Sequence, residues 1–411
     1  MPKQAEISDD LRADLHDLYR HLHAHPELSM AEHDTAALIT ARMIALGYTV
    51  TACAGTGVIA TLTRGVGPVV AFRADIDGLP LPEATGLSYA STDRGTLPDG
   101  SDVPVMHACG HDTHITCAIG AATLLAGESQ GWRGTVVFVF QPAEETAVGA
   151  AAMVADGVWD KALPDGRRPE VVYSQHVWPG RSGTVSITPG PAMARADALK
   201  VTVHGRGGHG SRPEGTIDPV VLMAYMIVRI QSIVAREVAA QSPAVITVAT
   251  VQAGLKENII PPTAEFTLNV RTLDDDVRAR VMTALRRVIR AEAQASAAPE
   301  PQIEEMYTFP LLVNDEAFTA EAVQVLRGEL GDDRVGHVPA SMGSEDFGHL
   351  TQAIGAPGAY WFFGGTPDAV VDGEGPVPFN HSPLFAPTLE PTLSTGVRAA
   401  YAVLRHRLSS A

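Results

Sequence analysis

The sequence predicts an α/β protein: a mixed, mostly parallel sheet with helices on both faces, interrupted by an inserted α+β domain. Three observations predict it. Short apolar runs typical of buried strands alternate with helical patterns in the first and last parts of the chain. The order of strands and helices changes between residues 194 and 306. The length of 411 residues exceeds what one hydrophobic core usually serves, which favours two domains.

The N-terminal part is predicted to open with two helices. Residues 8–25 place leucines at helical spacing behind Ser8, a residue type that caps helix N-termini. Ser29 and Glu32 then stand at the spacing of a capping box before a second helix. Residues 113–126 are also predicted to be helical. The apolar runs that suit buried strands are GVIATLT, PVVAFRADID, GTVVFVFQ and EVVYSQHVW.

Residues 194–306 are predicted to form the inserted domain. The patterns in this stretch run strand, helix, strand, strand, helix, strand, from ADALKVTVHG to QIEEMYTF. That order is the ferredoxin-like arrangement. The alternating pattern of the first part resumes afterwards, so residues 1–193 and 307–411 are assigned to one discontinuous domain.

Composition argues against several classes of protein. The formal net charge of −17 argues against a nucleic-acid binder. The sequence shows no apolar leader and no run of eighteen apolar residues, so we expect no membrane association. Three cysteines are too few, and odd in number, for a disulfide framework. We therefore expect a cytoplasmic protein.

Cysteine and histidine are concentrated in one short stretch, MHACGHDTHITC. Cys109 and His111 lie on the loop before a predicted helix, and thiolate and imidazole are the usual ligands of zinc and similar ions. Taken alone, the pair also fits a buried cysteine beside a surface histidine. His107, His114 and Cys117 are expected to pack around the pair, with Cys117 in the core.

Further candidate ligands follow other predicted strands. Glu144 and Glu145 in FQPAEE come directly after a buried strand, where open α/β sheets build sites, although a solvated acidic turn fits them too. SQHVWP adds His176 and FNHSP adds His381, and each histidine alone is more often structural. Five candidate ligands result, a number that suits two metal ions sharing a bridging group better than one structural ion. They are Cys109, His111, Glu145, His176 and His381. Glu144 would then handle a proton.

Asp75 and Asp77 end another predicted strand, in AFRADIDGLP. An aspartate behind a ligating imidazole fixes its tautomer and raises its basicity. The same two residues could instead cap the turn that follows the strand.

Together these motifs resemble a known family. FRADIDGLP, MHACGHD, FQPAEE, HVWPG, GRGGHGSRP, ENIIP, GSEDF and NHSP occur in the order seen in the amidohydrolase branch of the aminoacylase and carboxypeptidase G clan. That branch includes hippurate hydrolases, N-acetyl-amino-acid deacetylases, indoleacetyl-amino-acid hydrolases and N-acyl-glutamine aminoacylases. The resemblance implies a zinc-peptidase-like catalytic domain. It also implies metal-dependent hydrolysis of N-acyl amino acids to a carboxylic acid and a free amino acid.

The resemblance implies a role for each candidate in the discontinuous domain. The residues that match metal ligands are Cys109, His111, Glu145, His176 and His381. Glu144 matches the general base and acid. Asp75 matches the supporting aspartate, with Asp77 close enough to leave that alignment open. The implied cofactors are two divalent ions per subunit, with zinc expected and manganese, cobalt or nickel as alternatives.

The inserted domain matches the family's lid and dimerisation domain. Within it, His209 matches a histidine that reaches the partner subunit's active site and stabilises the oxyanion. Asn258 and Arg271 match positions that hold the substrate. The resemblance therefore implies a homodimer, with a tetramer as the alternative, that acts on a small-molecule N-acyl amino acid.

One departure leaves the substrate specificity open. Many relatives carry a second histidine shortly after the GGH element, where this chain has Arg212, Pro213 and Glu214.

Three other functions compete with the amidohydrolase. A dipeptidase or carboxypeptidase of the same clan is disfavoured by the cysteine in MHACGHD, because the peptidase branches have aspartate there. An idle metal-binding protein is disfavoured because no expected ligand or base is missing. A redox role for Cys109 lacks a C-x-x-C partner.

Overall fold

The structure is a computed structural model that describes residues 5–128 and 131–409. The chain divides into two compact units. Unit 1 comprises Met1–Gly190, Val313–Pro339 and Asp346–Ala411, and unit 2 comprises Pro191–Leu312 and Ala340–Glu345. The short segment Ala340–Glu345 belongs to unit 2, which the sequence patterns do not indicate.

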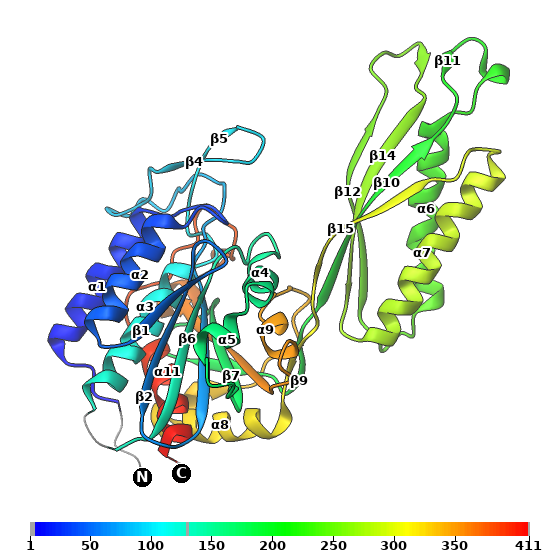
Figure 1. The fold of residues 1–411 in the computed structure, drawn as a ribbon. Coiled ribbons are helices and arrows are strands. Elements are labelled where there is room, and N and C mark those ends of the chain that lie inside the picture. The colour runs from blue at the N-terminus through cyan, green and yellow to red at the C-terminus, as the bar shows by residue number, and fades with distance from the viewer. Residues whose placement is uncertain (1–4, 129–130, 410–411) are drawn as a thin grey trace. The chain divides into compact units, whose positions relative to one another are not determined.

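Unit 1 is built on an eight-stranded mixed sheet (Figure 1). Its strands, in spatial order, are β1 (Thr49–Cys53), β2 (Gly57–Arg64), β6 (Gly134–Gln141), β3 (Val69–Asp75), β7 (Val171–Arg181), β18 (Gly358–Thr366), β8 (Val185–Ile187) and β17 (Val335–Gly336). The central strands β6, β3, β7 and β18 are mutually parallel. Antiparallel pairs flank them, β1 with β2, β2 with β6, and β8 with β18. The predicted fold class is confirmed.

Helices cover both faces of this sheet. One face shares a hydrophobic core with α1 (Asp9–Ala24), α2 (His33–Ala45), α3 (His111–Gly127), α8 (Glu316–Leu330) and α11 (Thr392–Ser409). On the other face, α4 (Gly149–Ala155) contacts β6 and α5 (Val158–Ala162) contacts β2, with α9 (Gly348–Gln352) beside α4. Strands β3 and β6 are buried along their whole length, which explains why their sequences are mostly apolar.

The predicted capping box at the second helix is wrong. Ser8 caps α1 as expected, since its side chain accepts the N–H of Leu11. At α2, however, Glu32 makes no capping hydrogen bond. The carboxylate of Glu27 instead accepts the N–H groups of Asp34 and Thr35. Ser29 and Glu32 are used in tertiary contacts described below, which local spacing does not reveal.

Unit 2 has the predicted ferredoxin-like order. It runs β10 (Arg195–His204), α6 (Pro219–Glu237), β12 (Ala244–Ala253), β14 (Thr263–Thr272), α7 (Asp275–Ala295) and β15 (Gln302–Phe309). The strands form an antiparallel sheet in the order β12-β14-β10-β15, and both helices share its core. Two short strands, β11 (Gly208–His209) and β13 (Ile259–Ile260), pair with each other.

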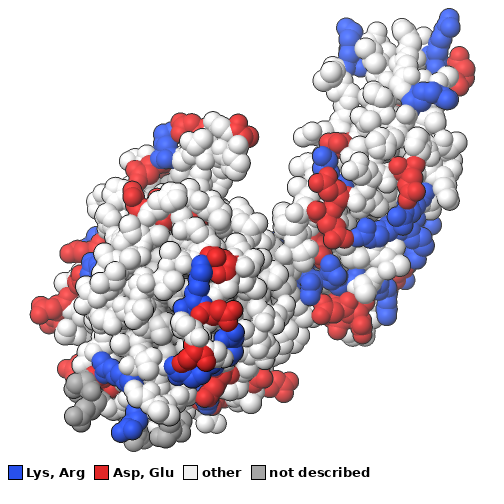
Figure 2. All heavy atoms as spheres, viewed as in Figure 1, with Lys and Arg blue, Asp and Glu red and all other residues white. Residues whose placement is uncertain are grey.

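Helices α6 and α7 pack their apolar stripes against this sheet. By length and composition α6 could cross a membrane, but Leu222, Met226 and Ile230 on one of its stripes are buried in the core of unit 2. That pattern is typical of a helix that covers a sheet. The other side of α7 is charged, and Arg287 pairs with Glu237 at the end of α6. Acidic and basic side chains are interspersed on the face seen in Figure 2.

The remaining elements are short. They are β4 (Arg94–Thr96), β5 (Asp102–Pro104), β9 (Gly190–Met193), the 3₁₀ turn Pro213–Gly215, β16 (Leu312–Asn314), the 3₁₀ turn Asp332–Arg334 and α10 (Asp368–Val371).

Candidate metal centre

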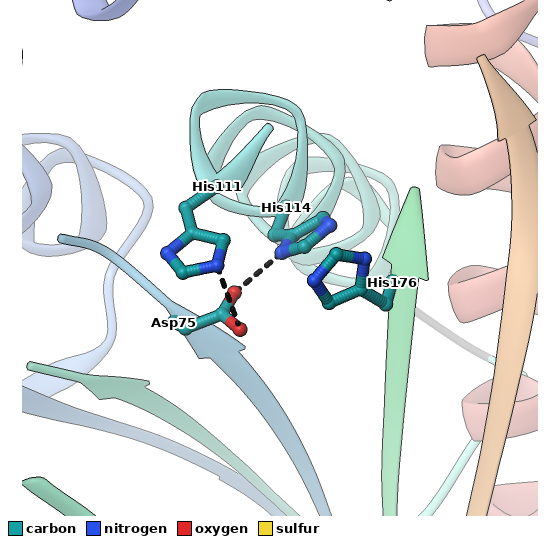
Figure 3. Close-up of side chains that lie close together, drawn as sticks. All are labelled: Asp75, His111, His114 and His176. Carbon is teal, nitrogen blue, oxygen red and sulfur yellow. Dashed lines mark hydrogen bonds and ion pairs between the residues drawn. The ribbon is translucent and has the colours of Figure 1, made fainter. Parts of the chain in front are cut away.

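The candidate ligands of unit 1 meet because three parallel strands end at the same edge of the sheet. Strand β3 ends at Asp75, β6 ends at Gln141 just before Glu144, and β7 carries His176. His111 is the first residue of α3, so it lies beside the carboxyl ends of these strands (Figure 3). Ligand sites of open α/β sheets form at this edge.

His111 is held by Asp77 through Nδ1, and its Nε2 faces two carboxylates. Its Nδ1 lies 3.2 Å from Oδ1 of Asp77, to which the Nδ1–H donates. Its Nε2 is buried without a hydrogen-bond partner among the described residues, and it lies 3.5 Å from Oδ2 of Asp75 and 3.8 Å from Oε1 of Glu145. That oxygen is also buried and also lacks a partner. The separation is too long for a hydrogen bond but suits two groups that share an ion.

Asp77 also organises the turn that carries both glutamates. Its carboxylate accepts the backbone N–H groups of Glu144 at 3.2 Å and Glu145 at 3.1 Å, and the hydroxyl of Ser29 at 2.6 Å. The turn is further fixed by the buried carboxylate of Glu32, which accepts the N–H of Ala143 at 2.9 Å. One aspartate therefore orients both His111 and the FQPAEE turn.

Asp75 has different partners. It is fully buried, and its carboxylate accepts hydrogen bonds from Nη1 of Arg73, at 2.9 Å, and from Nδ1 of His114. Nε2 of His114 accepts the backbone N–H of Val177 at 2.8 Å, so both nitrogens of that ring are used. Figure 3 shows the contact between His114 and Asp75. His114 thus lies within reach of the candidate ligands, as a group with Asp75, His111 and His176, but holds the backbone of β7 in place. The contact with Nδ1 of His111 is made by Asp77.

The other candidate ligands lie near the sulfur of Cys109 and the carboxylate of Glu145. Nδ1 of His176 donates to its neighbour's carbonyl, Val177 O, at 2.6 Å. Its Nε2 therefore carries a lone pair, 3.4 Å from Sγ of Cys109. Nε2 of His381 lies 3.3 Å from Oε2 of Glu145. Ligand atoms of Cys109, Glu145 and His381 form one group within 4.8 Å of one another.

Glu145 belongs to two such groups. The second group joins it with His111 and Glu144. Oε1 of Glu145 lies near His111 and its Oε2 lies near His381, so this one carboxylate faces candidate ligands of both groups. Sulfur, imidazole and carboxylate donors together suit zinc and similar divalent ions.

The electrostatics of the centre favour a cation. Burial, reinforced by Glu145 and Glu144, raises the pKa of the Cys109 thiol well above its ordinary value. Burial alone would lower the pKa of His111, but Asp75, Asp77 and Glu145 outweigh it and raise that pKa to about 10. The carboxylates therefore hold a proton on His111 and would equally hold a positive ion.

A buried ion pair that the sequence patterns did not indicate lies behind this centre. Nδ1 of His23 is 2.6 Å from Asp112, the residue after His111, and its Nε2 is 3.1 Å from Glu83. Next to Glu83, the N–H of Ala84 donates to the carbonyl of Pro383 at 2.8 Å, in the loop that carries His381. His23 therefore links the segments that present two candidate ligands. The only sequence signal was a histidine on the buried stripe of a predicted helix.

The three candidates of unit 2 lie in two places. His209 is exposed on β11, and the N–H of the next residue, Gly210, donates to the carbonyl of Asn258 at 2.9 Å. Arg271 lies toward the other end of β14, about 26 Å along the strand from Thr263, the end next to β13. Its Nη1 donates to the carbonyl of Met342 at 2.7 Å. Unit 2 therefore brings His209 and Asn258 together and leaves Arg271 apart from them.

The tautomer of His209 follows from one backbone contact. The N–H of Ser211 lies 3.1 Å from Nδ1 of His209, and a backbone N–H can only donate. Nδ1 must then be the acceptor, so in the neutral ring the proton is on Nε2. The exposed His209 is therefore a hydrogen-bond donor through Nε2.

Comparison with known proteins identifies the family. A model of peptidase family M20/M25/M40 matches residues 71–402. The hippurate hydrolase of Campylobacter jejuni is 37% identical, covering 84% of this chain and 86% of that protein. Thermostable carboxypeptidase 1 of Saccharolobus solfataricus is 35% identical, with 84% of each chain covered. The crystal structure of the Bacillus subtilis YXEP protein, described as a dinuclear metal binding peptidase of family M20, has a TM-score of 0.79 and 30% identity over 98% of this chain and 100% of that chain. The resemblance predicted from the motifs is confirmed: the chain belongs to peptidase family M20/M25/M40.

Proposed function

We propose that this hydrolase cleaves the amide bond of N-acyl amino acids with two divalent ions held in unit 1. The residues proposed to hold the ions are Cys109, His111, Glu145, His176 and His381. The proposal rests on one observation above all: Nε2 of His111 and Oε1 of Glu145 are buried without a hydrogen-bond partner among the described residues and lie 3.8 Å apart, with Oδ2 of Asp75 3.5 Å from the same nitrogen. Zinc is the proposed ion because of the thiolate, with manganese, cobalt or nickel as alternatives.

Side chains of the protein are proposed to carry the separate roles of proton transfer and of support for the ligands. When bound, the ions supply Lewis acidity, which acidifies a water molecule and polarises the amide carbonyl. Glu144 is proposed to accept the proton of the attacking water and to return it to the nitrogen of the leaving amine. The backbone N–H of Glu144 donates to Asp77, which fixes the position from which the Glu144 side chain extends. We assign to Asp77 the support of His111, in place of Asp75.

His209 is proposed to stabilise the oxyanion. Its Nε2–H is the free donor, because Ser211 occupies Nδ1. By resemblance, it serves the active site of a partner subunit, so we propose a homodimer in which unit 2 is the lid and dimerisation domain. A cytoplasmic location is supported by the three cysteines, all of which are free thiols in the structure.

A carboxypeptidase or dipeptidase is the second candidate, because one of the relatives is a carboxypeptidase at 35% identity. Release of free amino acid separates the two. Metal-loaded protein would be given N-acetyl, N-benzoyl and N-decanoyl amino acids and two plain dipeptides, with Glu144→Ala as the blank. Release from an acyl amino acid above the blank supports the amidohydrolase, and the preferred acyl group defines the pocket. Release from dipeptides alone supports the peptidase and overturns the proposal.

A further inference from the structure

We propose that Asn380 is a positioning residue of the metal centre, whose side-chain amide ties three ligand-bearing segments together and directs an N–H at the sulfur of Cys109. The inference rests on the proposed function in one respect, namely that Cys109 and its neighbours bind metal. It concerns a residue next to the ligand His381 that is not itself a ligand.

The contacts of one nitrogen atom carry the proposal. Nδ2 of Asn380 lies 3.0 Å from the carbonyl oxygen of Cys109 and 3.3 Å from that of Val177. It also lies 3.8 Å from Sγ of Cys109. Val177 directly follows His176, and Asn380 directly precedes His381. A single amide group therefore touches the backbone beside three of the five proposed ligands.

The orientation of this amide is fixed by chemistry. Two of the three atoms around Nδ2 are carbonyl oxygens, which can only accept a hydrogen bond. The oxygen of the amide would be repelled there, so the NH₂ group must face them. The two hydrogens of the NH₂ group face three acceptors, so the sulfur of Cys109 shares one hydrogen with a carbonyl oxygen. Oδ1 points elsewhere and is buried without a hydrogen-bond partner in the described part of the chain.

The backbone around Asn380 needs this support. His381 has φ of 68°, in the left-handed region that is unfavourable for a residue with a side chain. Its N–H donates to the carbonyl of Ala108 at 2.8 Å, one residue before Cys109. Together with the side chain of Asn380, this bond holds the loop in the conformation that brings Nε2 of His381 to Glu145.

The N–H directed at Sγ also has an electronic consequence. The sulfur of Cys109 is buried beside the carboxylate of Glu145, so the positive end of the amide dipole is a favourable neighbour for a thiolate. A hydrogen bond to a ligating sulfur lowers the energy of its lone pairs and tunes the bond to the ion. Loss of the amide should therefore change a spectroscopic property of the sulfur, which a merely structural residue would not do.

Cobalt is the probe that reports this effect. A thiolate bound to Co²⁺ gives a charge-transfer band in the near ultraviolet, and its energy follows the energy of the sulfur lone pairs. We would titrate metal-free protein with Co²⁺ and compare the wild type with Asn380→Leu, which keeps the volume, and Asn380→Asp, which keeps the shape but places oxygen against the carbonyls. Ser382→Ala is the matched control, because its hydroxyl accepts only the N–H of Leu384 in the same loop.

The expected result is a shift of the band to longer wavelength in Asn380→Leu and a loss of Co²⁺ affinity of about 10- to 100-fold. Asn380→Asp should lose more affinity than Asn380→Leu, since a carboxylate there repels two carbonyls and the sulfur. Ser382→Ala should match the wild type in both properties. An unchanged band and affinity in both Asn380 variants overturns this inference alone. Absence of the band in the wild type overturns the proposed metal centre and this inference with it.

Discussion

Oδ1 of Asp77 lies 3.2 Å from Nδ1 of His111, on the opposite side of the ring from the nitrogen that faces Glu145. The same carboxylate accepts the backbone N–H groups of Glu144 and Glu145. One buried aspartate therefore fixes the tautomer of a proposed ligand and the turn that carries the proposed base. A change at Asp77 is therefore expected to affect both the proposed ligand and the proposed base.

Asp77→Asn should weaken metal binding about 10- to 100-fold, because an amide cannot accept from His111 and from both backbone N–H groups as a carboxylate does. Competition with a chromophoric chelator measures the affinity. Asp75→Asn is the matched variant. It should mainly destabilise the fold, by about 3–5 kcal/mol, because it leaves the fully buried Arg73 with one anionic partner fewer. Equal losses of metal affinity in the two variants would contradict the assignment of Asp77.

Glu144→Ala should keep both metal ions and lose nearly all turnover. Glu144 is proposed to move a proton and not to hold an ion, and general acid–base groups contribute about 10²- to 10⁴-fold to a rate. Metal content is measured by elemental analysis and turnover by release of amino acid. Glu145→Ala is the comparison, since it should lose metal. Substantial turnover in Glu144→Ala would show that another group is the base.

His209→Ala should lower kcat about 10²- to 10³-fold at unchanged metal content, which is the size of effect seen when one oxyanion donor is removed. Ser211→Ala should cost much less. That variant keeps the backbone N–H that sets the tautomer of His209 and loses only the hydroxyl, 2.8 Å from Nδ1. Steady-state kinetics on both variants make the comparison. Loss of metal in His209→Ala would place this residue among the ligands instead.

The ion pair of His23 should make stability depend on pH. Burial lowers the pKa of His23, but Asp112 and Glu83 outweigh burial and raise it to about 10. Its contribution is then complete below the unfolded pKa of about 6.5 and is lost as pH rises through about 10. Burial raises the pKa of Asp112 and of Glu83, but the hydrogen bond and charge of His23, together with other hydrogen bonds, outweigh burial and lower the pKa of both. Their contribution is present above the ordinary carboxyl pKa of about 4 and is lost as pH falls below it.

His23→Gln tests this dependence on metal-free protein. Denaturant unfolding of wild type and variant should differ by about 3–5 kcal/mol near pH 6, the cost of breaking a buried ion pair. The difference should shrink steadily between pH 7 and pH 10. A difference that stays constant over that interval would mean that His23 contributes through packing alone.

Much of the fold follows from the sequence because the burial of each strand determines the order of apolar and polar residues along it. Strands β3 and β6 are buried along their whole length, so their residues are mostly apolar, and the charged Arg73 and Asp75 of β3 pair with each other. The strands of unit 2 have helices on one face only, and β14 alternates between buried and half-buried residues. The start of α2 was missed for the opposite reason: Ser29 and Glu32 have the spacing of a capping box but bond to Asp77 and Ala143, far away in sequence.

The candidate centre was predictable in its residues but not in its contacts. Motifs at strand ends pointed to the ligands, since parallel strands end at one edge. Sequence could not decide between Asp75 and Asp77, because Asp75 is the last residue of β3, Asp77 lies just beyond it, and their spacing does not show which one contacts His111. Nor could it show that both nitrogens of His114 are occupied. The separation of Arg271 from Asn258 depends on the course of β14, which local patterns do not define.

We propose above all that unit 1 holds two divalent ions. The most direct measurement is an anomalous difference map from a crystal grown with zinc, recorded on both sides of the zinc absorption edge. Two peaks about 3.5–4 Å apart are expected, and the residues that would hold the ions are Cys109, His111, Glu145, His176 and His381. A single peak away from Glu145, or no peak in that edge of the sheet, would contradict it.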